Sequence, residues 1–304
     1  MRTTIIALVV LLGLSTPAVH AFEGTLKWRT MSGMIASLAP LGAKAEDPQT
    51  VLALASDKVA GMPGVTTSQF DLLIKGSKVK ERPQGNAAYV VVDGATGQIW
   101  MINPASKRYV EWSQEDRDML QKRLTDLEKK QEEKIATMTG PERDQAQQRL
   151  DEQRAAARAQ GDLENLGKQE TIAGFVTTLW QVKVPGRLAH AAIATEPADL
   201  AQTFRGVYAA RAKMQGKTGL QPRDLKEIVS EKGIPVRIVS VQGSAFKIDE
   251  IVASEPGPIS DTEVRIPAGF EKTSLQDYLK GALQQRLQQS MPKTLPGAPT
   301  TPAK

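Results

Sequence analysis

Residues 69–112 read QFDLLIKGSKVKERPQGNAAYVVVDGATGQIWMINPASKRYVEW, and this stretch decides the fold. Strand-like runs follow one another here, separated by short turns at Gly76-Ser77, at 94–97 and at 104–107. Turns of this length join antiparallel neighbours, because parallel strands need a crossover of about a dozen residues or more. The stretch therefore predicts an antiparallel meander.

The chain before the meander predicts one more strand and a helix. From Phe22 to Trp28 apolar and polar residues alternate, the period of two expected for a strand with one buried face. After Asp47-Pro48, apolar residues recur at helical spacing as far as Val59, with Gly61 behind them. This second pattern predicts a capped helix of about three turns.

A helical hairpin is predicted to interrupt the strands at 113–167. Ser113 offers an N-cap before acidic residues, and Gly140-Pro141 separates a first helix from a second that runs to about Gly161. We interpret the hairpin as an insertion whose first helix resembles one half of a coiled coil. Its apolar stripe consists of Leu120, Leu124, Leu127, Ile135 and Met138.

Strands and helices alternate after the hairpin. Helices are expected from Pro197, after Pro222 and from Ser274 to about Gln289. Further strands are expected at 172–184, 188–195, 235–241, 245–253 and 262–266. Strands with turn-length links and grouped helices predict an α+β fold, in which helices cover one strongly curved antiparallel sheet. We expect 22–290 to form a single domain and the proline-rich residues 291–304 to be a disordered tail.

Residues 1–21 have the features of a cleavable signal peptide. Arg2 precedes ten apolar residues, Ile5 to Leu14, and Val19 and Ala21 suit a small-residue cleavage site. A retained membrane anchor is the alternative, but an apolar helix needs about 20 residues to cross a bilayer. We therefore expect a soluble periplasmic protein. The chain has no cysteine, so it has neither disulfides nor a thiol for lipid attachment.

The charge pattern is mild and mixed. The chain has 39 basic and 34 acidic residues, spread along its length with few aromatics, which makes nucleic-acid binding a poor interpretation. The strand around Lys78, Lys80 and Arg82, with Lys75 close by, is the densest positive stretch. This strand could face anionic head groups or an acidic partner. We favour the alternative that it is a solvated strand or an edge strand, which lysine protects against aggregation.

The usual catalytic residues are scarce. Once residues 1–21 are removed, His190 is the one histidine left. Together with the absence of cysteine, this excludes most transition-metal sites, thiol chemistry and any histidine triad that does not use His190. His190 lies in a strand of small apolar residues, where a packed histidine is a better interpretation than a catalytic base. No phosphate-binding or dinucleotide glycine motif is present. We expect neither an enzyme nor a cofactor.

Aromatic and apolar residues of the predicted strands are candidates to line a ligand cavity. A strongly curved sheet that helices close in part encloses an apolar hollow, although packing in a core explains such residues as well. The cavity candidates are Trp28, Phe70, Leu72, Trp100, Tyr109, Phe175 and Trp180.

Short motifs along about 200 residues, taken in order, resemble an uncharacterised family of bacterial exported proteins. They are FDLLIKGSK at 70–78, VD at 92–93, WMINP at 100–104, KRY at 107–109, TIAGF at 171–175, EKGIPV at 231–236 and IPAGF at 266–270. The resemblance implies the incomplete β-barrel of the LolA-like lipoprotein carriers, in which a curved sheet and covering helices form a cavity for acyl chains. The hairpin at 113–167 is longer than that pattern, and no carrier site residue can be transferred.

Two functions are consistent with these features. The first is a non-enzymatic periplasmic protein that binds a lipid, a lipoprotein acyl chain or another apolar ligand in a half-barrel cavity. The second is a protein-interaction module of the cell envelope without a ligand, in which the hairpin docks a partner through Leu120, Leu124 and Leu127.

Overall fold

The computed structural model describes residues 21–44, 47, 49–54, 56–83, 87–158, 161–215 and 223–281. Within these ranges one sheet of twelve strands runs in the order β12-β6-β5-β4-β3-β2-β1-β11-β10-β9-β8-β7. Its strands are β1 (Glu23–Met34), β2 (Val65–Lys75), β3 (Lys78–Pro83), β4 (Tyr89–Asp93), β5 (Gln98–Asn103), β6 (Arg108–Glu111), β7 (Asp162–Ile172), β8 (Phe175–Val184), β9 (Arg187–Ala194), β10 (Ile234–Gln242), β11 (Ala245–Pro256) and β12 (Glu271–Lys272).

The meander predicted from 69–112 is confirmed as strands β2 to β6, each antiparallel to the next. The long strand β1 pairs with β2 on one side and β11 on the other, and so joins the two halves of the sheet. Every neighbouring pair is antiparallel except β12 and β6, which are parallel. The fold is therefore α+β with a large, mostly antiparallel sheet, as expected.

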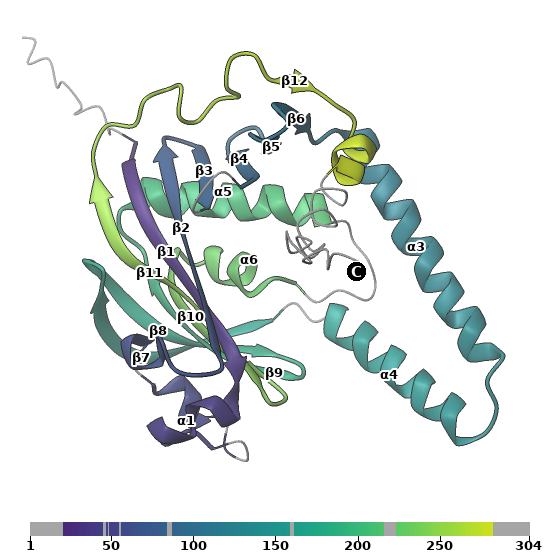
Figure 1. Ribbon diagram of the computed structural model, residues 1–304. Coiled ribbons are helices and arrows are strands. Elements are labelled where there is room, and N and C mark those ends of the chain that lie inside the picture. The colour runs from purple at the N-terminus through teal and green to yellow at the C-terminus, as the bar shows by residue number, and fades with distance from the viewer. Residues whose placement is uncertain are drawn as a thin grey trace, which may run out of the picture.

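The sheet is not closed into a barrel, because β12 and β7 are its two edges. It bends around α5 (Ala198–Gln215) and α6 (Leu225–Ser230), which lie against one face (Figure 1). The main core lies between α5 and this face, where Leu200, Phe204 and Val207 of the helix pack against Leu26 and Ile74 of the sheet.

The opposite face is covered near the far ends of β1 and β11 by three short helices. They are the 3-10 helix η1 (Ile35–Leu41), α1 (Gln49–Leu52) and α2 (Ser56–Val59). A second core of buried side chains lies beneath them, with Met31, Ile35, Val51, Phe246 and Ile248 among its members. Burial on both faces explains why β1 and β11 carry apolar residues at neighbouring positions.

The predicted helical hairpin consists of α3 (Gln114–Ala136) and α4 (Pro141–Arg158). Ser113 caps α3 as expected, since its hydroxyl accepts from the backbone N–H of Asp116 while the Asp116 carboxylate accepts from the Ser113 N–H. The pair extends away from the sheet (Figure 1). The range predicted for it, 113–167, reaches into a strand, because β7 already begins at Asp162.

Three local predictions differ from the structure. The helix expected after Asp47 is two short helices, α1 and α2, and the break between them lets the Ser56 hydroxyl donate to buried Glu250 at 2.5 Å. The strand expected at 172–184 is divided by a turn at Ala173-Gly174, where both residues have positive φ. Residues 261–265 form turns rather than a strand.

These turns lie over the sheet, and this explains why their sequence has the alternating pattern of a strand. Val264 is buried, while Lys75 reaches Asp261 at 2.9 Å and Lys80 reaches Glu263 at 3.2 Å. A loop that is half covered by a sheet alternates buried and exposed side chains much as a strand does. The edge interpretation of the positive stretch Lys75 to Arg82 is wrong, because β3 lies between β2 and β4. Acidic residues of this loop cover the stretch in part.

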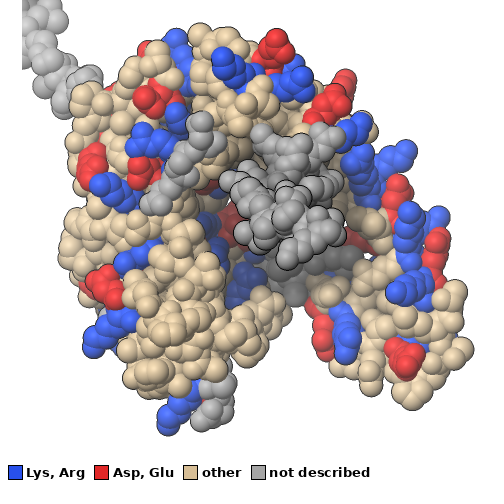
Figure 2. All heavy atoms as spheres, viewed as in Figure 1, with Lys and Arg blue, Asp and Glu red and all other residues tan. Residues whose placement is uncertain are grey.

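Some predictions fall on residues outside the described ranges. These are nearly all of the signal peptide at 1–21, the tail at 291–304 and the last helix beyond 281, which is helical at 275–281. In the described part of the chain, no helix combines the length and the apolar character needed to cross a membrane. Lys, Arg, Asp and Glu are interspersed over the face drawn in Figure 2, without one large region of a single sign.

Candidate functional site

Four of the seven cavity candidates belong to the main core beside α5. Trp28, Leu72 and Phe175 are buried there, and Phe70 packs against them. The rings of Trp28 and Phe70 are stacked with their centroids 6.1 Å apart. Trp28 and Phe70 also line a hollow of about 290 Å³ at the end of β3, beside Pro83 and Arg82.

The other three candidates lie elsewhere. Trp180 packs at the border of a separate cluster beneath α6. Trp100 and Tyr109 face the opposite side of the sheet, because their strand neighbours Ile99 and Val110 point into the main core and side chains alternate along a strand. The structure therefore does not gather the seven residues around one cavity.

His190 lies in β9, between Gln181 of β8 and Val239 of β10. Partial burial lowers the pKa of His190, and nearby Lys168 lowers it further. Over the described residues, no group of three or more histidine, cysteine, aspartate or glutamate side chains is placed to hold a metal ion.

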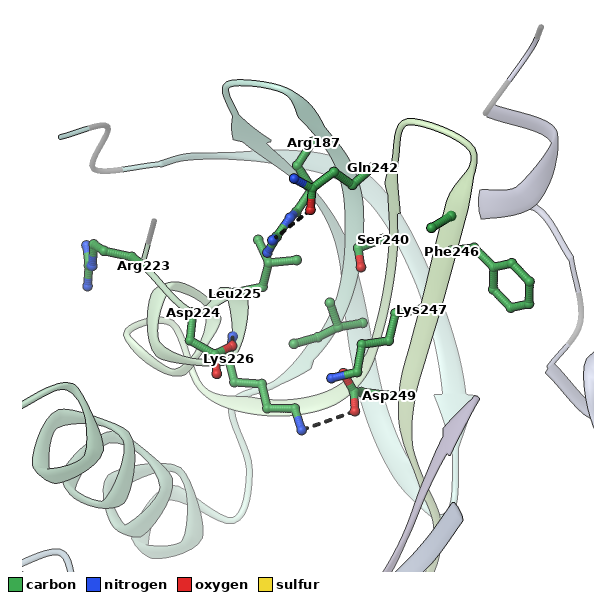
Figure 3. Close-up of a pocket in the computed structure, with 12 residues that line it drawn as sticks. Arg187, Arg223, Asp224, Leu225, Lys226, Ser240, Gln242, Phe246, Lys247 and Asp249 are labelled. Carbon is green, nitrogen blue, oxygen red and sulfur yellow. Dashed lines mark hydrogen bonds and ion pairs between the residues drawn. The ribbon is translucent and has the colours of Figure 1, made fainter. Parts of the chain in front are cut away.

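A polar cavity of about 380 Å³ lies between α6 and the strands β10 and β11, and we call it the α6 cavity (Figure 3). Sequence reasoning missed it, because its walls come from β9, the segment before α6, α6 itself, β10 and β11. It is lined by Arg187, Arg223, Asp224, Leu225, Lys226, Ile238, Ser240, Gln242, Ala245, Phe246, Lys247 and Asp249. The Phe246 ring points away from the cavity, so Leu225, Ile238 and Ala245 supply its apolar side chains (Figure 3).

Asp249 is the centre of the polar wall. Its Oδ1 accepts a hydrogen bond from the Thr30 hydroxyl at 2.7 Å and lies 3.1 Å from Nζ of Lys226. Its Oδ2 lies 2.8 Å from Nζ of Lys247. Although burial alone would raise the pKa of Asp249, the two ammonium groups outweigh it and hold this pKa below its ordinary value.

Lys226 is the most deeply placed cation of the cavity. Its Nζ lies 4.5 Å from the centroid of the Trp28 ring, so the ammonium group rests between an aromatic face and Asp249. Burial lowers the pKa of Lys226, and Asp249 opposes this shift in part. Trp28, which the sequence suggested as a cavity residue, does not line this cavity. It supports the site indirectly, because its ring contacts the Lys226 ammonium group.

The remaining charges divide between the interior and the rim. On the cavity wall, partly exposed Arg187 donates to the side-chain oxygen of exposed Gln242 at 3.2 Å. At the rim, Arg223 points away from the cavity and is paired with Glu227 at 2.8 Å and Glu231 at 2.6 Å (Figure 3). Asp224 caps α6 by accepting from the backbone N–H of Lys226 at 2.9 Å.

No protein-family model matches the sequence, and no curated protein is similar to it. Two solved structures of PNGF-II, one in space group C2 and one in P21, align with this chain at a TM-score of 0.39 each. The sequence identities are 6% and 8%, over 86% of this chain and 33% and 34% of theirs. The chain thus spans about a third of the length of those chains. A likeness of this size supports no statement about function.

Proposed function

We propose that the protein is a non-enzymatic ligand-binding protein of the bacterial cell envelope. It takes up a lipid, a lipoprotein acyl chain or another apolar ligand, whose polar end lies in the α6 cavity. The observation that carries the proposal is this cavity, because about 380 Å³ lies within the range of roughly 300–1,000 Å³ usual for ligand sites.

The apolar part of the ligand fits beside the cluster beneath α6. In this cluster Leu225 and Ile228 of α6 pack on Val182, Ala191 and Ile238 of the sheet. Leu225 and Ile238 also line the cavity, so the polar and apolar surfaces are continuous. An acyl chain that lies against Leu225 and Ile238 takes its methylene groups out of water, and each group that leaves water completely contributes about 0.8 kcal/mol.

The architecture supports this proposal. An open, mostly antiparallel sheet with α5 and α6 on one face suits the half-barrel of the LolA-like carriers, which the sequence motifs resemble. The signal-peptide features of residues 1–21 favour the periplasm as the place where the ligand is bound.

Native mass spectrometry of protein purified from the periplasm without detergent tests the proposal. We expect a bound molecule of lipid mass that organic extraction releases. Replacing Ser240, which lines the cavity, with tryptophan should remove this molecule, whereas Ser106→Trp in the exposed turn before β6 should leave it bound. A bare polypeptide mass, together with no uptake of added lipid by the folded protein, would refute ligand binding.

A protein-interaction role through the hairpin remains the second candidate. Leu127 of α3 is 60% exposed and the hairpin extends from the sheet (Figure 1), which favours a docked partner. Part of the stripe is already in use, since Leu120 packs against the main core and Ile135 is buried. Replacing 114–158 by a short linker separates the two functions: loss of a partner with intact ligand uptake supports docking, and the reverse rejects it.

A further inference from the structure

The inner wall of the α6 cavity has more positive than negative charge. It carries the side chains of Arg187, Lys226 and Lys247 and the carboxylate of Asp249. Both ammonium groups share that one carboxylate, at 3.1 Å and 2.8 Å. In the part of the chain that the structure describes, no carboxylate lies within ion-pair distance of Arg187, whose guanidinium contacts Gln242.

The residues at the rim offset this positive charge only in part. Arg223 points away from the cavity (Figure 3) and is paired with Glu227 and Glu231. Asp224 is exposed and caps α6, and its carboxylate is a second negative charge in the lining that favours the charged form of Lys226. The lining as a whole still has four cations against two carboxylates. Lys226 is mostly buried, so it attracts an anion more strongly than it would in open water.

We propose that this inner wall binds the anionic head group, a carboxylate or a phosphate, of an amphipathic ligand. The inference rests on the proposed function and names the ligand's class. The forked guanidinium of Arg187 matches two oxygens of such a group. Lys226 and Lys247 have further N–H donors, and the Ser240 hydroxyl lies on the same wall (Figure 3). The cavity's volume fits a head group, while the acyl chain lies toward the cluster beneath α6.

Calorimetric titration of the delipidated protein with matched probes tests the proposal. The probes are decyl phosphate, decanoate, decanol and inorganic phosphate, all below micelle-forming concentrations. We expect both anionic amphiphiles to bind at least about tenfold more tightly than decanol, since a charge-assisted hydrogen bond contributes enough for such a factor. Inorganic phosphate should bind weakly, because it lacks the chain.

Variants of partly exposed cations show whether the wall is responsible. Arg187→Gln and Lys247→Gln should each weaken binding of the anionic probes about tenfold and leave decanol binding unchanged. Lys272→Gln is the matched control, because Lys272 is similarly exposed and also forms an ion pair, with Glu111 on β6. Both wall residues retain partly exposed side chains, so these variants are expected to fold.

The outcomes separate the two proposals. Equal binding of decanol and the anionic probes, or unchanged binding in both wall variants, overturns the head-group assignment and leaves the proposed function standing. Tight binding of inorganic phosphate without any binding of the amphiphiles supports the anion chemistry but overturns the lipid ligand. If no probe binds, both proposals are overturned.

Discussion

Among single residues, Asp249 has the largest role in holding the site together. It is 5% exposed and is contacted by Thr30, Lys226 and Lys247. We expect Asp249→Asn to lower the free energy of unfolding by about 3 kcal/mol, since removing one member of a buried ion pair leaves the other charge uncompensated. Urea denaturation at pH 7 measures this change, and a loss below about 1 kcal/mol would contradict it.

The same residue predicts a dependence on pH. Because the pKa of Asp249 is lowered in the folded protein, its contribution to stability is fully present above its ordinary value of about 4. The contribution is lost as the pH falls through the lower pKa of the folded state. The difference in unfolding free energy between the parent and Asp249→Asn should therefore shrink on acidification from about pH 5 to about pH 2. A constant difference over this range would show that the ion pairs contribute nothing.

The strand pairs and the start of α3 were predictable where short stretches of sequence determine them. The turns at Gly76-Ser77, 94–97 and 104–107 define strand pairs by their length alone, and Ser113 marks the start of α3. The pairing of β1 with β11 was not predictable, because it joins residues more than 200 positions apart, such as Trp28 and Ile251. No local pattern encodes such a contact.

The candidate site was harder to predict for the same reason. Lys226 comes from α6, Lys247 and Asp249 come from β11, and Arg187 comes from β9. One signal was present: Asp249-Glu250 stands inside an apolar strand, and two consecutive acids in a strand must face opposite sides. Both are buried, Asp249 against Lys226 and Glu250 against Arg29. Two buried charges in a core strand indicate a partner for each.

The position of α5 depends on a close approach between a helix and a turn. A methyl group on Gly206 would lie 2.5 Å from the carbonyl oxygen of Gly94. Such a clash costs about 2–3 kcal/mol, more than the roughly 1 kcal/mol that alanine gains over glycine in a helix. Gly206→Ala should therefore lower the unfolding free energy by about 1–2 kcal/mol in urea.

Gly257→Ala is the control for this substitution. Among the described residues, no atom lies within 4 Å of the position that its methyl group would take. Its effect should stay within about 0.5 kcal/mol. Equal effects of the two substitutions would mean that α5 does not depend on contact with the turn at Gly94.

For the molecule as a whole, the central claim is that an amphipathic ligand occupies the α6 cavity. The chain has no cysteine, so one introduced thiol reports on one place. Ser240→Cys puts a thiol on the cavity wall, and Ser106→Cys puts one in an exposed turn. The measurement is the rate at which a thiol reagent modifies each variant, with and without decyl phosphate at a concentration that calorimetry shows to be saturating.

We expect decyl phosphate to slow modification of Ser240→Cys about tenfold or more, because a bound ligand keeps the reagent out of the cavity. The rate at Ser106→Cys should not change. An unchanged rate at Ser240→Cys while the ligand is bound would contradict the account, since it would place the ligand somewhere else on the protein.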